Sequence, residues 1–95
     1  MENCIVACQI CQIILGTTHP CWQSCYDCEK VCIFMLDSQI NSQYLRNQIV
    51  KLSMDACRLC IIQCSKYRKM HKECLDCYNA CIKCIQYLSS RLVTR

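Results

Sequence analysis

Turn-forming residues are nearly absent from this sequence, which has one Gly, Gly16, and one Pro, Pro20, in 95 residues. A fold of many short strands needs such residues at its turns, so their scarcity disfavours all-β architectures. It favours instead a few long helices joined by short links. A chain of this length forms one modest core, and we therefore expect a single domain over residues 1–95.

The residue sets of common active sites and of membrane anchors are missing as well. The sequence holds no Ser/His/Asp set, no paired carboxylates and no glycine-rich phosphate loop, and its seven acidic residues are scattered. No apolar run reaches the roughly 18 residues that a membrane span needs. No export signal precedes the first Cys, because the chain opens on Met1 and the acidic Glu2. We expect a cytoplasmic protein that is not an enzyme and has no membrane partner.

The charge distribution gives little support to nucleic-acid binding. The net charge is +4, and its densest basic cluster contains Lys66, Arg68, Lys69 and Lys72. Basic residues in the last turn of a helix offset the helix dipole, which accounts for this cluster without a nucleic-acid partner. We therefore expect no nucleic acid among the partners.

Cysteine is the residue that the sequence has in excess, at 14 of 95 positions. Such a count indicates either a secreted disulfide scaffold or a metal–thiolate protein. Disulfide-dense miniproteins are commonly rich in Gly and Pro turns, and this chain is not. Reduced thiols in a reducing compartment are therefore the better interpretation.

The spacing of the Cys residues predicts where they lie. They form four groups, and the steps within each group are three or four residues, which places a group on one stripe of an α-helix. Such an inward stripe normally carries Leu and Ile, whereas here the aliphatic residues flank it. The groups are Cys4, Cys8 and Cys11; Cys21, Cys25, Cys28 and Cys32; Cys57, Cys60 and Cys64; and Cys74, Cys77, Cys81 and Cys84.

These stripes predict an all-α fold, an up-down-up-down antiparallel four-helix bundle with a Cys-lined core. Gly16 would end the first helix, Thr17 or Thr18 would cap the second, and Asp37 and Ser38 would mark the break before the third. The expected helices cover about residues 3–15, 20–36, 40–67 and 72–92.

The two ends of such a bundle differ in composition. His19 and His71 fall at one end, next to Met70 and to Cys11, Cys21, Cys64 and Cys74, so metal would enter there. Met1, Met35 and Met54 fall at the other end, where we expect their side chains to fill the channel beside Cys4, Cys32, Cys57 and Cys84.

Charge arithmetic favours Cu(I) as the bound metal. Cys residues three or four positions apart on a helix suit a soft ion held between two thiolates. One Cu(I) per Cys leaves the core neutral, whereas four thiolates around Zn(II) leave two negative charges in it. A thiolate buffer for Zn(II) or Cd(II) remains an alternative, as does a structural or interaction bundle with inert thiols, since Cys also packs as a small hydrophobic residue.

The four stripes resemble those of the bacterial copper storage proteins, a family of Cys-rich four-helix bundles, over nearly the whole stretch from Cys4 to Cys84. The resemblance implies that all 14 Cys point inward and bind multiple Cu(I) ions, roughly one per Cys. It also implies a homotetramer, and metal entering beside His and Met residues at one mouth, for which His19 and His71 are the candidates. Lacking an export signal, the chain looks like the cytosolic branch. Its first and third groups hold three Cys rather than four, which leaves the number of ions open.

Overall fold

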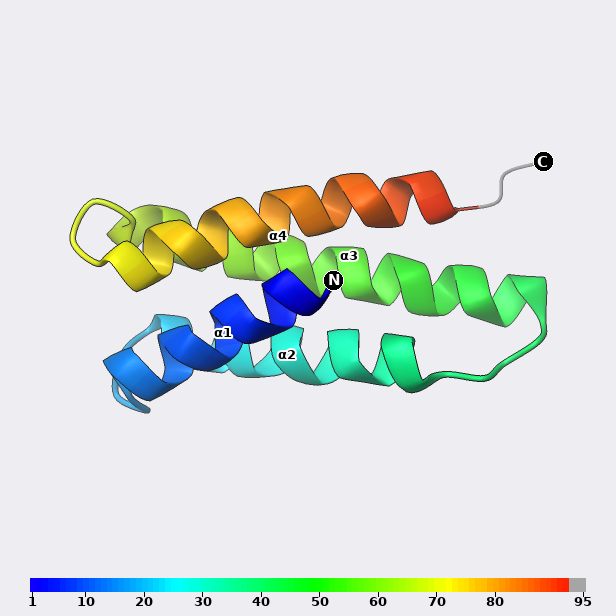
Figure 1. The fold of residues 1–95 in the computed structure, drawn as a ribbon, viewed down its shortest axis with the longest axis horizontal. Helices are drawn as coiled ribbons and strands as arrows, with labels where there is room; N and C mark the ends of the chain where they lie inside the picture. The colour runs from blue at the N-terminus through cyan, green and yellow to red at the C-terminus, as the bar shows by residue number, and fades with distance from the viewer. Residues whose placement is uncertain (93–95) are drawn as a thin grey trace.

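The fold is known from a computed structural model, which describes residues 1–92. Its four helices run alternately up and down, which confirms the expected all-α bundle (Figure 1). No helix in the described part of the chain combines the length and the hydropathy needed to cross a membrane. The helices are α1 (Glu2–Leu15), α2 (Cys21–Asp37), α3 (Gln43–Tyr67) and α4 (Lys72–Arg91).

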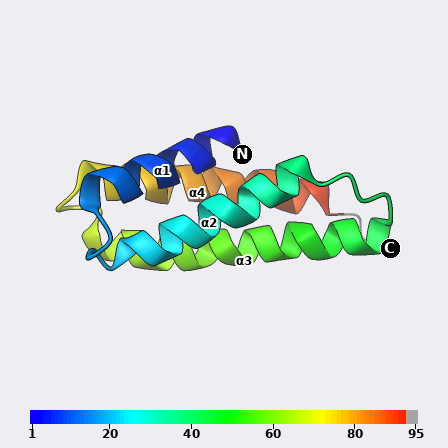
Figure 2. The ribbon, with the colours of Figure 1, turned by 90° about the horizontal axis from the view of Figure 1, so that it is seen from below.

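Each helix packs against two neighbours, so that α1 and α3 face each other across the bundle. α1 and α3 both contact α2 and α4. The molecule measures 42 × 20 × 17 Å. The α1–α2 and α3–α4 links lie at one end, which we call the His end, and the longer α2–α3 link lies at the other (Figures 1 and 2). Because α1 begins near the middle of the long axis, three helices build most of that far end (Figure 1).

The start of α2 differs in detail from the expectation. Neither Thr17 nor Thr18 caps it, since Pro20 occupies the N-cap position and no side chain from that position bonds to the helix. The Nδ1 atom of His19 accepts a hydrogen bond from the backbone N–H of Cys21 at 3.1 Å instead. An imidazole thus satisfies one of the free amides of the first turn, a task that Ser, Thr, Asp or Asn usually performs.

The third helix begins later than expected, at Gln43 instead of about residue 40. Its cap is Ser42, whose Oγ accepts a hydrogen bond from the Leu45 N–H at 3.3 Å. Asp37 and Ser38 mark the break before α3 as expected, because α2 ends at Asp37 and Ser38 is its C-cap in extended backbone. The sequence did not single out Ser42 as the cap, because only the path of the α2–α3 link decides which residue precedes the helix.

The core changes character along the bundle axis. All 14 Cys line the part that includes α1, and we call this part the thiol column. Beyond it, towards the α2–α3 link, lies a Cys-free end in which Val50, Ser53, Met54 and Leu88 are buried. The one hydroxyl among them is satisfied, because Ser53 Oγ donates to the Ile49 carbonyl at 3.0 Å. The two regions therefore share three helices but not their chemistry.

A polar clamp joins α1 to α2 outside the thiol column. The carboxylate of Glu29, only 8% exposed, accepts hydrogen bonds from Nε2 of Gln9 and of Gln12, each at 2.9 Å. Burial raises the pKa of this carboxyl, but the bonds from Gln12 and Gln9, with help from nearby Lys30, outweigh it and leave the pKa below its ordinary value. The carboxylate therefore stays ionised and holds the shortest helix in place.

Candidate metal centre

The thiol column is a closed interior in which sulfur replaces the usual aliphatic core. No Cys side chain is more than 3% exposed, and all 14 thiols are free of disulfide bonds. Every predicted metal-ligating Cys therefore points inward, as the three- and four-residue spacing requires of a helix whose stripe faces its neighbours. What the sequence did not reveal is which sulfurs meet across the bundle.

The shortest sulfur–sulfur contacts join different helices. Cys60 and Cys77 bring α3 and α4 together with their Sγ atoms 3.4 Å apart. Cys4 and Cys81 connect α1 to α4 at 3.6 Å. Within one helix, Cys60 and Cys64 form a hydrogen-bonding pair at 3.9 Å. The expected pairing along a helix thus exists, but contacts between helices set the tightest spacing.

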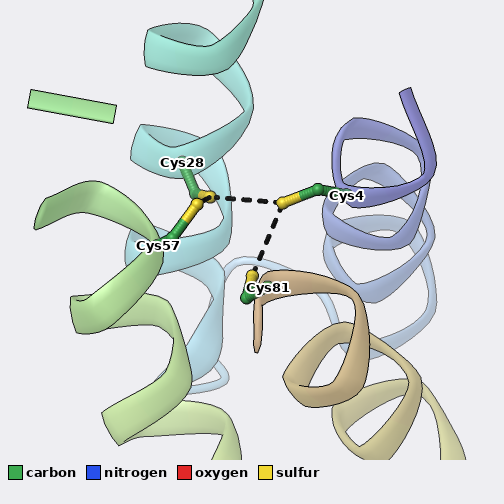
Figure 3. A group of neighbouring side chains, drawn as sticks. All are labelled: Cys4, Cys28, Cys57 and Cys81. Atoms are coloured by element: carbon green, nitrogen blue, oxygen red, sulfur yellow. Dashed lines mark hydrogen bonds between the residues drawn. The ribbon is translucent and has the colours of Figure 1, made fainter. Parts of the chain in front are cut away.

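These contacts assemble eleven of the thiols into four overlapping groups of four, within each of which all sulfur atoms lie within 4.8 Å of one another. Two of the groups take one Cys from each helix, and Figure 3 shows the four side chains of one of them, Cys4, Cys28, Cys57 and Cys81, pointing toward one another between the helices. Sulfurs this close are able to share metal ions without moving the backbone. The groups are Cys4, Cys28, Cys57 and Cys81; Cys4, Cys32, Cys57 and Cys84; Cys8, Cys60, Cys77 and Cys81; and Cys25, Cys60, Cys64 and Cys77.

Burial keeps the thiols at the His end protonated. It raises the pKa of Cys21 to about 12 and also raises that of Cys74, whose Sγ lies 3.8 Å from that of Cys21. A metal ion that enters the column must therefore displace protons, one from each thiol that it binds as thiolate.

The two histidines meet at the His end, as predicted. Their ring centroids lie 5.2 Å apart, and Tyr67 packs edge-on against His19 with a centroid distance of 4.7 Å. Both rings are half-buried. Because Nδ1 of His19 accepts the Cys21 amide, Nε2 is the nitrogen of His19 that remains for a metal ion. Met70 stays exposed on the α3–α4 turn.

Methionine side chains and a cavity lie beyond the far end of the column. Cys4, Cys32, Cys57 and Cys84 form the last thiol group. Beyond them Met54 is buried, and Met1 and Met35 pack against the core and line one cavity of about 310 Å³. The three methionines thus lie at this end, as expected from the sequence, but Met1 and Met35 border a cavity there and do not fill it.

Comparison with known proteins identifies the chain. The family model of the copper storage proteins, abbreviated Csp, matches residues 1–91. The chain belongs to the copper storage protein family. No curated protein and no solved structure matches it significantly.

Membership in the copper storage protein family confirms the expected function in its general form. The chain stores copper, and its buried Cys groups are able to bind metal ions. The family is not enzymatic, in agreement with the lack of catalytic residue sets in the sequence. The resemblance noted from the four Cys stripes was thus to the right family.

Proposed function

We propose that the protein stores Cu(I) on all 14 thiols of the column, at roughly one ion per Cys. The observation that carries this proposal is the complete burial of 14 unbridged thiols in one continuous interior. One Cu(I) for each thiolate cancels the charge, and sulfurs 3.4 to 4.0 Å apart suit bridging between adjacent ions. Each ion bound releases about one proton.

The test is an anaerobic titration of the reduced protein with Cu(I) against a competing chelator of known affinity. Saturation near one ion per Cys, with tight binding throughout, supports storage on the whole column. Saturation at three or four ions would favour a thiolate buffer for Zn(II) or Cd(II). No competitive binding at all would leave a structural bundle with inert thiols.

We propose that Cu(I) enters at the His end. His19 and His71 form a half-buried pair beside Cys21 and Cys74, which are the outermost thiols there. The far end holds Met1, Met35 and Met54, and neither of the two histidines of the chain lies there. In stopped-flow transfer from a chelator, His19→Ala and His71→Ala should slow uptake and leave the final copper content unchanged. Unchanged rates in both variants would contradict this route.

We propose that the bundle assembles into a homotetramer. The outer face of α1 exposes Val6, Ile10 and Ile13, and the outer face of α3 exposes Leu59 and Ile62. Since α1 and α3 lie across the bundle from each other, these apolar faces point in opposite directions. Two separate self-complementary faces generate a tetramer of dihedral symmetry, whereas one face generates only a dimer.

The tetramer is checked by analytical ultracentrifugation. Ile13→Lys and Leu59→Lys each place a charge on one exposed face and should each reduce the assembly to dimers, while the double variant should be monomeric. A monomeric wild-type protein would contradict the proposal.

We also propose that the chain acts as one domain in the cytoplasm, where the thiols stay reduced. Residues 93–95 of that domain lie outside the part of the chain that the structure describes.

A further inference from the structure

One group of thiols matches a coordination geometry that storage of Cu(I) does not require. Among Cys25, Cys60, Cys64 and Cys77, five of the six Sγ–Sγ distances lie between 3.4 and 4.0 Å. The sixth lies within 4.8 Å. A divalent ion bound tetrahedrally through metal–sulfur bonds of about 2.3 Å holds its sulfurs about 3.8 Å apart. The sulfur–sulfur distances of this group therefore match those of a tetrahedral site of four thiolates.

A second group of the same kind lies further along the column. Cys4 stands 3.8 Å from Cys28 and 3.6 Å from Cys81, and Cys28 stands 3.7 Å from Cys57, measured between Sγ atoms. One sulfur comes from each helix, the four side chains point toward one another (Figure 3), and all their sulfurs lie within 4.8 Å of one another. This group shares no Cys with the first.

We propose that the copper-free protein binds two divalent ions of the Zn(II) or Cd(II) class, each in a site of four thiolates. The proposal rests on the proposed role of the thiols as ligands and adds a second class of metal to it. Each ion takes the place of four thiol protons and leaves a complex of net charge −2. Cu(I) leaves no such charge in the buried core, so it displaces the divalent ions, which depart as M²⁺.

The limit of two ions follows from the way the groups overlap. The group containing Cys8 shares Cys60 and Cys77 with the Cys25 group, and it shares Cys81 with the group in Figure 3. The group containing Cys32 shares Cys4 and Cys57 with the group in Figure 3. No three groups are free of shared residues. Whenever two ions are bound at the same time, Cys57 is a ligand of one ion and Cys77 is a ligand of the other.

This overlap dictates the variants that test the proposal. Reduced protein is titrated anaerobically with Co(II), a stand-in for Zn(II) whose tetrahedral thiolate complexes absorb strongly in the visible range. The wild-type absorbance should reach its endpoint at two equivalents. Cys77→Ser and Cys57→Ser should each end at one equivalent, and the double variant should show no tetrahedral signal. Cys21→Ser is the matched control, because Cys21 is buried but belongs to no group.

Each outcome decides the question. An endpoint of two that falls to one in Cys77→Ser supports the sites, and circular dichroism checks that the variant remains helical. If Cys77→Ser does not fold, Cys60→Ser removes the same two groups and replaces it. A wild-type endpoint other than two, or an unchanged endpoint in both Cys77→Ser and Cys57→Ser, overturns the inference. The Cu(I) titration on the same samples is separate: normal Cu(I) capacity without a Co(II) signal overturns these sites and leaves copper storage intact.

Discussion

The thiol column and the Cys-free end share three helices, yet they contribute differently to the stability of the protein. Around Cys25 and Cys77 the interior holds small thiols, whereas around Met54 and Leu88 it holds larger apolar side chains. Burial of an apolar side chain stabilises in proportion to the area removed from water, so the Cys-free end contributes more for each residue. We expect the column, in turn, to gain stability when it binds metal. The difference indicates how a storage protein stays folded while it is empty.

The largest expected effect comes from loading the column. Free ligand at a concentration of 100 times the Kd of a single site stabilises the folded state by about 2.7 kcal/mol, and the column offers many sites. Cu(I) should therefore raise the melting temperature strongly and increase amide protection around Cys25, Cys60 and Cys77. Hydrogen exchange at residues 43–50, which carry no Cys, should change much less. An equal gain of amide protection in the two regions, or an unchanged melting temperature, would contradict the claim that metal stabilises the thiol column more than the Cys-free end.

The reverse experiment weakens the Cys-free end. Leu88 is fully buried there, so Leu88→Ala should cost about 2–5 kcal/mol of the free energy of unfolding in the metal-free protein. The copper capacity should remain unchanged, because no ligand is removed. Urea unfolding and Cu(I) titration measure the two quantities. Tyr44→Ala, at a position 70% exposed, serves as the control and should change the stability by less than about 0.5 kcal/mol.

A smaller effect is expected at the start of α3, which belongs to the Cys-free end. Ser42→Ala removes the side chain that caps the Leu45 amide and should cost about 1 kcal/mol, again by urea unfolding. Ser65→Ala is a suitable comparison, since Ser65 Oγ bonds only to the Ile62 carbonyl within the helix. If both substitutions had the same effect, Ser42 would not be the cap.

The smallest effect concerns the clamp beside the thiol column and depends on pH. The folded-state pKa of Glu29 lies below its unfolded value, so its contribution is fully present above the unfolded pKa and is lost as the pH falls through the folded pKa. Glu29→Gln should therefore reduce stability at neutral pH and bring the variant closer to the wild type in acid. The measurement is the free energy of unfolding of the reduced, metal-free protein and of the variant, from neutral pH down through the folded-state pKa of Glu29. A difference independent of pH would contradict the role of the carboxylate.

Much of this fold follows from spacing alone. Steps of three and four between Cys residues leave one solution on a helix, an inward stripe, and the structure buries every Cys of the four groups. The scarcity of Gly and Pro correctly indicated few helices with short links. The position of His19 and His71 at one end also followed from the alternation of helix direction.

Other features depended on partners distant in the sequence. That His19 caps α2 and packs against Tyr67 required the link between the helices to fold back over the bundle. The contact of Glu29 with Gln9 and Gln12 likewise depends on how α1 lies on α2. Neither has a sequence signature, because neither side chain belongs to a periodic stripe.

The sequence by itself determined that the interior consists of thiols, because the period of the α-helix turns a spacing into a face. Only the tertiary structure decided which thiols meet. The 3.4 Å contact between Cys60 and Cys77 and the shared groups of four depend on the rotation and register of four helices against one another. Packing across the bundle sets that register, and a spacing within one helix carries no information about it.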